Sequence, residues 1–246
     1  MFDHVGKTFI GKEFNKIYFG KNFYKLTKKS ENHFGFKFVD GINIDTYNFI
    51  PAICKIPSGL HFTDIKNLPF WTDYKTYIRK VTIPDDAIVY VGYNMFKADK
   101  IFLHERILLK DFELWDNLEF QKNAINCNAC HLKFIKNPSD LIQKMAVRLN
   151  GYSIYYIKDP SLEIQKLALC ENIYSYYYIK NPNEKIINFL KIICDDDVLF
   201  HKIISKNTDP LKIVCDTIAI DNKNNPISEN KNNNENKKNN DYCLLS

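Results

Sequence analysis

A sequence pattern that recurs every 22 residues constrains the fold of this 246-residue chain more than any other feature. The tetrapeptides IKNP, IKDP and IKNP occupy residues 135–138, 157–160 and 179–182, so their prolines lie 22 residues apart. An isoleucine recurs with the same spacing, at Ile142, Ile164 and Ile186. A fixed period of this length is typical of chains built from stacked supersecondary units.

Each period contains two segments with a helical pattern. Asn137, Asp159 and Asn181 each precede a proline, and this pairing is a favoured helix start. Apolar residues follow at helical spacing until NGYS at 150–153, where we expect Gly151 to end the helix in a left-handed conformation. A second short helix, rich in tyrosine, comes next. Because helices this short cannot bury their own apolar faces, we expect the helical hairpins to stack on their neighbours.

The first half of the chain has a pattern that predicts a sheet. Stretches rich in aromatic and β-branched residues lie at 34–39, 59–63, 77–84 and 87–93, with turn residues between them. The stretch 104–122 has a helical pattern, and we expect it to connect the two halves.

These patterns together predict an α+β fold class. A small domain with a mixed or antiparallel sheet is expected at residues 1–110, followed at 111–220 by an α-solenoid of 22-residue helical-hairpin repeats. Residues 221–246 are rich in Asn and Lys and have too few apolar side chains to form a core, so we expect a disordered tail.

Both halves also resemble known viral sequences. The stretch IQKMAVRLNGYSIYYIKDP at 142–160 resembles the short helical repeats of large amoebal DNA viruses of the mimivirus group. SGLHFTD at 58–64 and YIRKVTIPDDAIVYV at 77–91 resemble the amino-terminal module that precedes such repeats in mimivirus-type proteins. The resemblance implies a giant-virus protein with an α+β module followed by helical repeats, and it implies no particular activity.

The helical half favours a protein-binding or scaffold function over an enzyme. Lys122, Lys144 and Lys166 recur at the same position of successive periods and would form a row that could bind an acidic protein surface, phosphate or anionic lipid. The alternative is a solvated face that keeps the chain soluble. The net charge of +5 is small for this length, so we do not expect a nucleic-acid partner.

An enzymatic alternative comes from SGLHFTDIKNLPFWTDY at 58–74, which resembles a strand and loop of ADP-ribosyltransferases. The resemblance implies NAD as cofactor, with His33 binding the nicotinamide ribose and His61 replacing the tyrosine that stacks on nicotinamide. The glycine that usually follows the first histidine is missing, and Glu105 is the nearest acid to the expected position. The other possibility is an ordinary β-strand with His61 on its exposed face.

Two cysteine motifs suggest further sites. CNACH at 127–131 has the spacing of a haem-attachment or zinc motif, but no second Cys/His cluster accompanies it, so we expect no metal and no cofactor. The final residues Cys243-Leu244-Leu245-Ser246 match the prenylation pattern, which would give a weak membrane tether at Cys243.

The first residues have no signal-peptide pattern, so we expect an intracellular protein of the host cytoplasm, with possible membrane association through Cys243.

Overall fold

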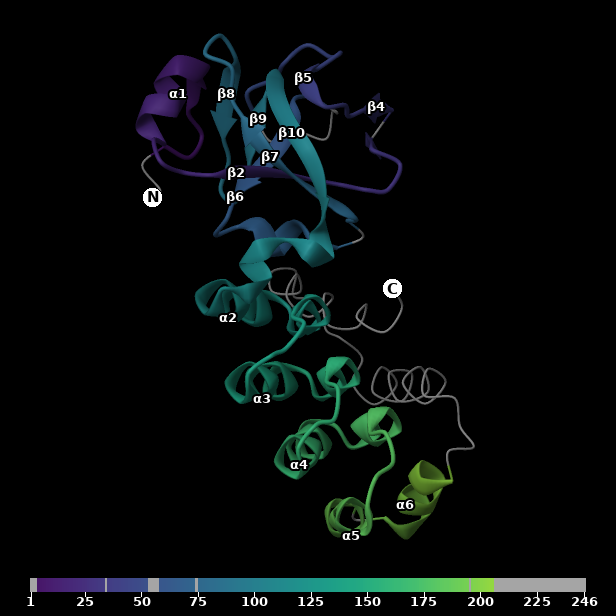
Figure 1. The fold of residues 1–246 in the computed structure, drawn as a ribbon. Coiled ribbons are helices and arrows are strands. Elements are labelled where there is room, and N and C mark those ends of the chain that lie inside the picture. The colour runs from purple at the N-terminus through teal and green to yellow at the C-terminus, as the bar shows by residue number, and fades with distance from the viewer. Residues whose placement is uncertain (1–3, 34, 53–57, 74, 195, 206–246) are drawn as a thin grey trace, which may run out of the picture. The chain divides into compact units, whose positions relative to one another are not determined.

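The computed structural model describes residues 4–33, 35–52, 58–73, 75–194 and 196–205 (Figure 1). The chain divides into two compact units that meet at Phe120 and Gln121, and each is described here by itself. The predicted domain bounds of 1–110 and 111–220 stay a prediction. The tail predicted at 221–246 lies outside the described residues.

The first unit contains an eight-stranded sheet in which every described pairing is antiparallel. The strand order is β1-β8-β9-β6-β2-β7-β10-β5. The strands are β1 (Thr8–Ile10), β2 (Phe23–Thr27), β5 (Gly41–Ile44), β6 (Leu60–Asp64), β7 (Tyr77–Thr82), β8 (Ile88–Val91), β9 (Phe96–Ala98) and β10 (Lys100–Leu108). A separate two-stranded pair joins β3 (Asn32–His33) to β4 (Phe36–Lys37).

Short helices complete the first unit. They are α1 (Gly11–Ile17) and the 3-10 helices η1 (Leu68–Trp71), η2 (Leu109–Asp111) and η3 (Glu113–Asp116). Gly11 allows α1 to approach the chain before β8, because a Cβ at this position would lie 1.9 Å from the carbonyl oxygen of Pro84. This close approach places the fully buried Phe14 ring among the aromatic side chains of the core.

The core of the first unit is strongly aromatic. The ring of Phe14 lies 4.5 Å from that of Tyr18, 5.2 Å from Phe23 and 5.6 Å from Phe96, measured between centroids. The rings of Phe62 and Phe96 stack at 5.4 Å. Edge-to-face and offset contacts at these distances add to the free energy gained by burying the rings.

From α2 to α5 the chain of the second unit alternates α-helices with 3-10 helices, and a further α-helix, α6, follows α5 (Figure 1). The elements are α2 (Leu118–Cys127, which crosses the boundary between the units), η4 (Ala129–Phe134), α3 (Asp140–Leu149), η5 (Gly151–Tyr156), α4 (Leu162–Glu171), η6 (Ile173–Tyr178), α5 (Glu184–Ile193) and α6 (Asp197–Ile204). Helix α3 packs on α4, η4 and η5, while α4 packs on α5 and η6. The isoleucines of the 22-residue pattern, Ile142, Ile164 and Ile186, are fully buried.

The predicted fold class is wrong. The sheet is not a small one, because eight antiparallel strands form it. No α-solenoid of helical hairpins is shown in the described residues, because the ten-residue helices α3 and α4 are each followed by a six-residue 3-10 helix and not by the second α-helix of a hairpin. The short tyrosine-rich helices of the prediction are 3-10 helices of six residues.

The predicted helix starts are also displaced. Asn137, Asp159 and Asn181 do not cap helices; Asp159 and Asn181 instead have left-handed φ values of 53° and 51° before their prolines. The N-caps come two residues later, at Ser139, Ser161 and Asn183, and each side chain accepts a hydrogen bond from a backbone N–H in the first turn. The asparagines Asn128, Asn150 and Asn172 cap the 3-10 helices in the same way.

Gly151 is required for a reason other than the predicted one. It does not have a left-handed φ, and Asn150 before it is extended. A Cβ on Gly151 would lie 2.7 Å from the carbonyl oxygen of Ala168 and 2.7 Å from Oγ of Ser175. The glycine therefore allows η5 to approach α4 and η6.

We expect Gly151→Ala to lower the free energy of unfolding by about 1–3 kcal/mol, because the added methyl group overpacks this contact. Urea denaturation followed by circular dichroism measures the change. The control is Lys158→Ala on an exposed loop residue, which should change stability by less than about 0.5 kcal/mol. Equal stability of Gly151→Ala and the wild type would contradict the close approach.

Candidate ligand pocket

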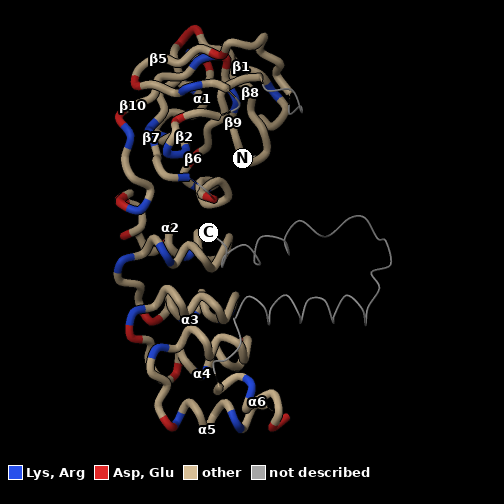
Figure 2. The backbone as a smooth tube through the Cα atoms, turned by 90° about the vertical axis from the view of Figure 1, so that its right-hand side faces the viewer, with Lys and Arg blue, Asp and Glu red and all other residues tan. Residues whose placement is uncertain are grey.

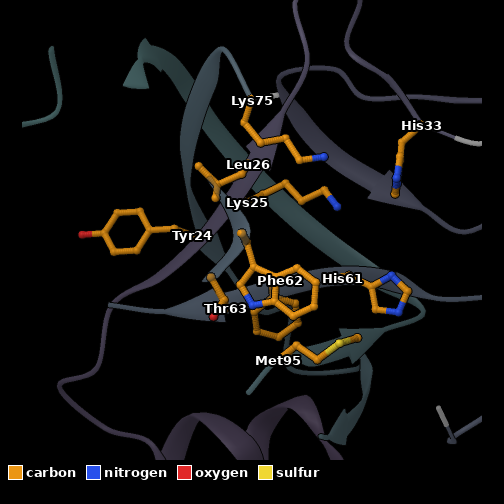
Figure 3. A pocket seen from close by; sticks show the side chains of 10 residues that line it. Tyr24, Lys25, Leu26, His33, His61, Phe62, Thr63, Lys75 and Met95 are labelled. Carbon is orange, nitrogen blue, oxygen red and sulfur yellow. The ribbon is translucent and has the colours of Figure 1, made fainter. Parts of the chain in front are cut away.

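A pocket with a volume of about 320 Å³ opens in the first unit (Figure 3). Strands β2 and β6 pair at Phe23↔Asp64 and Tyr24↔Thr63, which brings two otherwise distant stretches together. The lining residues are Tyr24, Lys25 and Leu26 of β2, His61, Phe62 and Thr63 of β6, and His33, Trp71, Lys75 and Met95. The volume lies within the range of small-molecule sites.

Two lysines give the pocket a positive charge. Lys25 is only 5% exposed, and its Nζ lies 4.6 Å from the centroid of the Phe38 ring. Burial lowers the pKa of Lys25 to about 7, with a further lowering by Lys75 and an opposing effect of Glu31. Burial also lowers the pKa of Lys75, and the charge of Lys28 adds to this effect. Near neutral pH the Lys25 amine is therefore divided between its charged and neutral forms.

Both histidines predicted from the sequence line this pocket. In Figure 3 the rings of His33 and His61 lie on the side toward which the Lys25 and Lys75 side chains extend. The pKa of each histidine is lowered to about 4, with burial as the largest cause and the charge of Lys25 as the next. Both imidazoles are therefore neutral at pH 7 and can accept or donate a hydrogen bond.

The described lining residues include no carboxylate. Glu105 does not begin a helix, as the sequence pattern suggested, but lies exposed on β10 and does not line the pocket. The roles of His33 and His61 as catalytic residues stay a prediction.

Sequence analysis missed Lys25 and Lys75. A signal was present for Lys25, because a single lysine interrupts the strand-forming sequence FYKLT, and all five residues of β2 are buried. Lys75 follows a 3-10 helix and carries no comparable signal. Its place in the pocket depends on the long-range pairing of the strands.

The lysines proposed to bind a partner make contacts within the second unit. Nζ of Lys144 lies 3.0 Å from Asp140 and 2.8 Å from Glu163, and these hydrogen bonds raise its pKa. Lys166 lies 5.0 Å above the Phe189 ring, and Lys122 on α2 is half-buried. Figure 2 shows acidic residues beside basic ones along α3 to α5. A binding role for these three lysines stays a prediction.

The cysteine motif at 127–131 is part of the helical packing. His131 is buried, and its Nδ1 lies 2.7 Å from the carbonyl oxygen of Ala124. Within the described ranges, no three His, Cys, Asp or Glu side chains are grouped so that they could bind a metal ion. Cys243 lies outside the described residues, so its prenylation stays a prediction. None of the described helices combines the length and apolar character needed to cross a bilayer.

Comparison with known proteins finds relatives in Acanthamoeba polyphaga mimivirus. The chain is 29% identical to "Putative ankyrin repeat protein R868" over 119 residues, which cover 43% of this chain and 59% of that protein. It is 29% identical to "Uncharacterized protein R869" over 101 residues, covering 39% of this chain and 73% of that protein. It is 30% identical to "Putative ankyrin repeat protein R896" over 109 residues, covering 37% of this chain and 32% of that protein.

These alignments support a relationship to mimivirus proteins, as the sequence resemblance implied. The chain spans less than two thirds of R868 and about a third of R896. No family model matches the sequence, and no solved structure matches it.

Proposed function

We propose that this chain is a protein-binding module of a mimivirus-type virus and acts through the exposed surface of its helical unit. The observation that carries this proposal is the similarity to two mimivirus proteins whose names include ankyrin repeats. Ankyrin repeats have a period of about 33 residues and two helices, whereas here one α-helix and one 3-10 helix recur every 22 residues. The proposal therefore concerns a shared type of function, and not a shared repeat structure.

The helical unit exposes large apolar side chains that a partner could cover. Tyr155 on η5 is 57% exposed, and Ile192 on α5 is 77% exposed. Exposed aromatic residues of this kind often contribute most of the free energy of a protein interface. The Tyr155 ring also contacts those of Tyr156 and Tyr178, so circular dichroism must show that a variant at this position is folded.

The test is affinity purification of the full chain after crosslinking in mimivirus-infected amoebae. We expect a protein partner to be recovered with the wild type and with Phe19→Ala, a control at a residue of the first unit that is 90% exposed. The double variant Tyr155→Ala/Ile192→Ala should recover that partner about tenfold less well. The absence of a stable partner, or equal recovery with the double variant, would contradict the proposal.

A second candidate function is NAD-dependent ADP-ribosyl transfer in the first unit, and the observation that favours it is the shared pocket of His33 and His61. The absence of a carboxylate from the described lining argues against an active enzyme. Release of nicotinamide from NAD by the purified chain, abolished in His33→Ala and His61→Ala, would support this candidate. No release by the wild type would exclude it.

A further inference from the structure

We infer that the pocket of the first unit is a binding site for a small organic anion that carries an aromatic ring, with Lys25 and Lys75 contacting the anionic group. Carboxylates and phosphate esters of aromatic compounds belong to this class. The inference does not depend on the protein-binding function proposed above, because it concerns the other unit of the chain. It also requires no transferase reaction.

The first argument is the charge of the pocket. Its described lining contains two lysines and two histidines, and no aspartate or glutamate. Glu31 is the carboxylate that acts on Lys25, but it already forms an ion pair with Arg79 at 3.4 Å and lies 3.9 Å from Arg106. Within the described lining, no carboxylate balances the charge of the two lysines, and an anionic ligand would do so.

The second argument is the environment of Lys25. Among the described residues its Nζ donates no hydrogen bond, and its close contact is the ring of Phe38. A charged amine that is almost completely buried costs free energy unless it is paired and hydrogen-bonded. Figure 3 shows Lys25 and Lys75 extending side by side into the space before His33 and His61, so one anion could contact both amines.

The third argument is the apolar wall of the pocket. Phe62, Met95 and Trp71 line it together with Leu26 and Tyr24. Nε1 of Trp71 donates a hydrogen bond to the carbonyl oxygen of Asn94 at 3.2 Å, which fixes the indole at the edge of the pocket. Flat apolar surfaces beside a charged group favour a ligand whose ring packs on the wall while its anionic group contacts the lysines.

The protonation of Lys25 couples this binding to pH. Because the pKa of Lys25 is about 7 without ligand, and an anion favours the charged amine, the pKa must be higher in the complex. At pH 6 the amine is already charged, so the affinity is highest there. Above pH 7 binding must take up a proton, and Kd rises by up to roughly tenfold per pH unit until the pKa of the complex is reached.

The other titratable and charged groups near Lys25 do not reverse the expected rise of Kd with pH. His33 and His61 have pKa values of about 4 and stay neutral throughout the range. Arg79 lies opposite Lys25 on β7 and forms an ion pair with Glu31. Burial lowers the pKa of Lys75, and the charge of Lys28 adds to this effect. Loss of the Lys75 proton as pH rises would therefore also weaken the binding of an anion. Lys97, which acts on His61, donates to the carbonyl oxygen of Ala52 at 2.6 Å.

The test uses 1-naphthalenesulfonate as the probe, because its charge is constant between pH 6 and pH 9. Isothermal titration calorimetry on the full chain should detect binding at pH 6, with a Kd at pH 8 roughly tenfold higher. The neutral 1-naphthalenesulfonamide and the ring-free methanesulfonate should each bind at least about tenfold more weakly. Equal binding of the sulfonamide, or a Kd that does not change with pH, would overturn the inference.

Variants separate the role of Lys25 from a general effect of charge. Lys25→Met should weaken sulfonate binding at pH 6 by at least about tenfold. Lys25→Arg keeps the charge at every pH, so it should bind and should lose the part of the pH dependence that Lys25 causes. The exposed Lys12→Met on α1 is the matched control and should bind as the wild type does.

A second variant keeps the test valid if Lys25→Arg does not fold or if its longer side chain blocks the pocket. Lys75 is partly exposed, and Lys75→Met should also weaken binding. Thermal unfolding of each variant shows whether it is folded. Competition with adenosine monophosphate and with benzoate then distinguishes a nucleotide from an aromatic carboxylate as the natural class. If neither displaces the sulfonate, the pocket is not a biological site for this class and the inference is wrong.

Discussion

Replacing Phe14 with alanine is expected to lower the free energy of unfolding of the first unit by about 3–5 kcal/mol. The Phe14 side chain is 0% exposed, and its ring contacts those of Tyr18, Phe23 and Phe96. The substitution removes the buried ring and leaves a cavity that the flanking strands cannot fill without distorting the sheet. This is a large part of the stability of a typical domain.

Tryptophan fluorescence during urea denaturation measures this change specifically. The chain has two tryptophans, Trp71 and Trp115, and both belong to the first unit. The signal therefore reports unfolding of that unit even if the second unit unfolds separately. Phe19→Ala removes the same side chain where it is 90% exposed, and should change stability by less than about 0.5 kcal/mol. Similar effects of the two substitutions would contradict the position of Phe14 in the core.

Replacing Arg79 with methionine is expected to destabilise the first unit by about 3–5 kcal/mol, because it leaves the buried Glu31 without its principal charge partner. Arg79 is 3% exposed on β7. It pairs with Glu31 and Asp40 and donates a hydrogen bond to the carbonyl oxygen of His104 at 3.0 Å. One guanidinium thus connects β7 to β10 and to the segment before β5.

A double-mutant cycle tests this network. Arg79→Met/Glu31→Gln should be less destabilised than the sum of its two single variants, because the second change removes the unpaired buried charge. Lys80→Met, at the exposed next position of the same strand, is the control and should have little effect. Additive effects at Arg79 and Glu31 would mean that the two charges do not stabilise each other. The measurement is again fluorescence-detected urea denaturation.

The local sequence predicted some strands of the first unit and failed at others. The strands expected at 59–63, 77–84 and 87–93 correspond to β6, β7 and β8. The helix expected at 104–122 is wrong for residues 104–108, which belong to β10 and pair with β5 and β7, whereas η2, η3 and the start of α2 occupy most of the remaining stretch. The charged residues after Leu103 produce a pattern that is also typical of an exposed helix. The partners of β10 lie far away in the sequence, with pairs from Phe102↔Thr82 to Leu103↔Gly41, and local patterns do not reveal such pairing.

In the helical unit the period was visible in the sequence, while the geometry within each period was not. The error at the tyrosine-rich segments arose because an Asn cap followed by six residues suits a 3-10 helix as well as an α-helix. The error at the prolines arose because Asn-Pro and Asp-Pro form a turn here, and the following Ser or Asn provides the cap. Both errors concern competing local hydrogen bonds of similar free energy.

For the pocket, the sequence indicated two of the lining residues but not that they lie together. His33 and His61 could be selected from the sequence because the stretch at 58–74 resembles a strand and loop of ADP-ribosyltransferases. Their common position could not be derived, because it follows from the pairing of β2 with β6 and from the separate β3–β4 pair. Lys25 became a candidate only when the structure showed that its side chain is buried beside that of Lys75.

The spacing of the N-caps has a consequence for how the length of this chain can change during evolution. Ser139 and Ser161 occupy the same place relative to α3 and α4, and each of these helices has ten residues. A gene deletion that joined Ser139 directly to Leu162 would remove one whole interval and leave a serine before an intact helix. A deletion within this stretch whose length is not a multiple of 22 residues would change the spacing between the caps and the buried isoleucines. Gain and loss of coding sequence should therefore be tolerated in steps of 66 nucleotides, which is 22 codons.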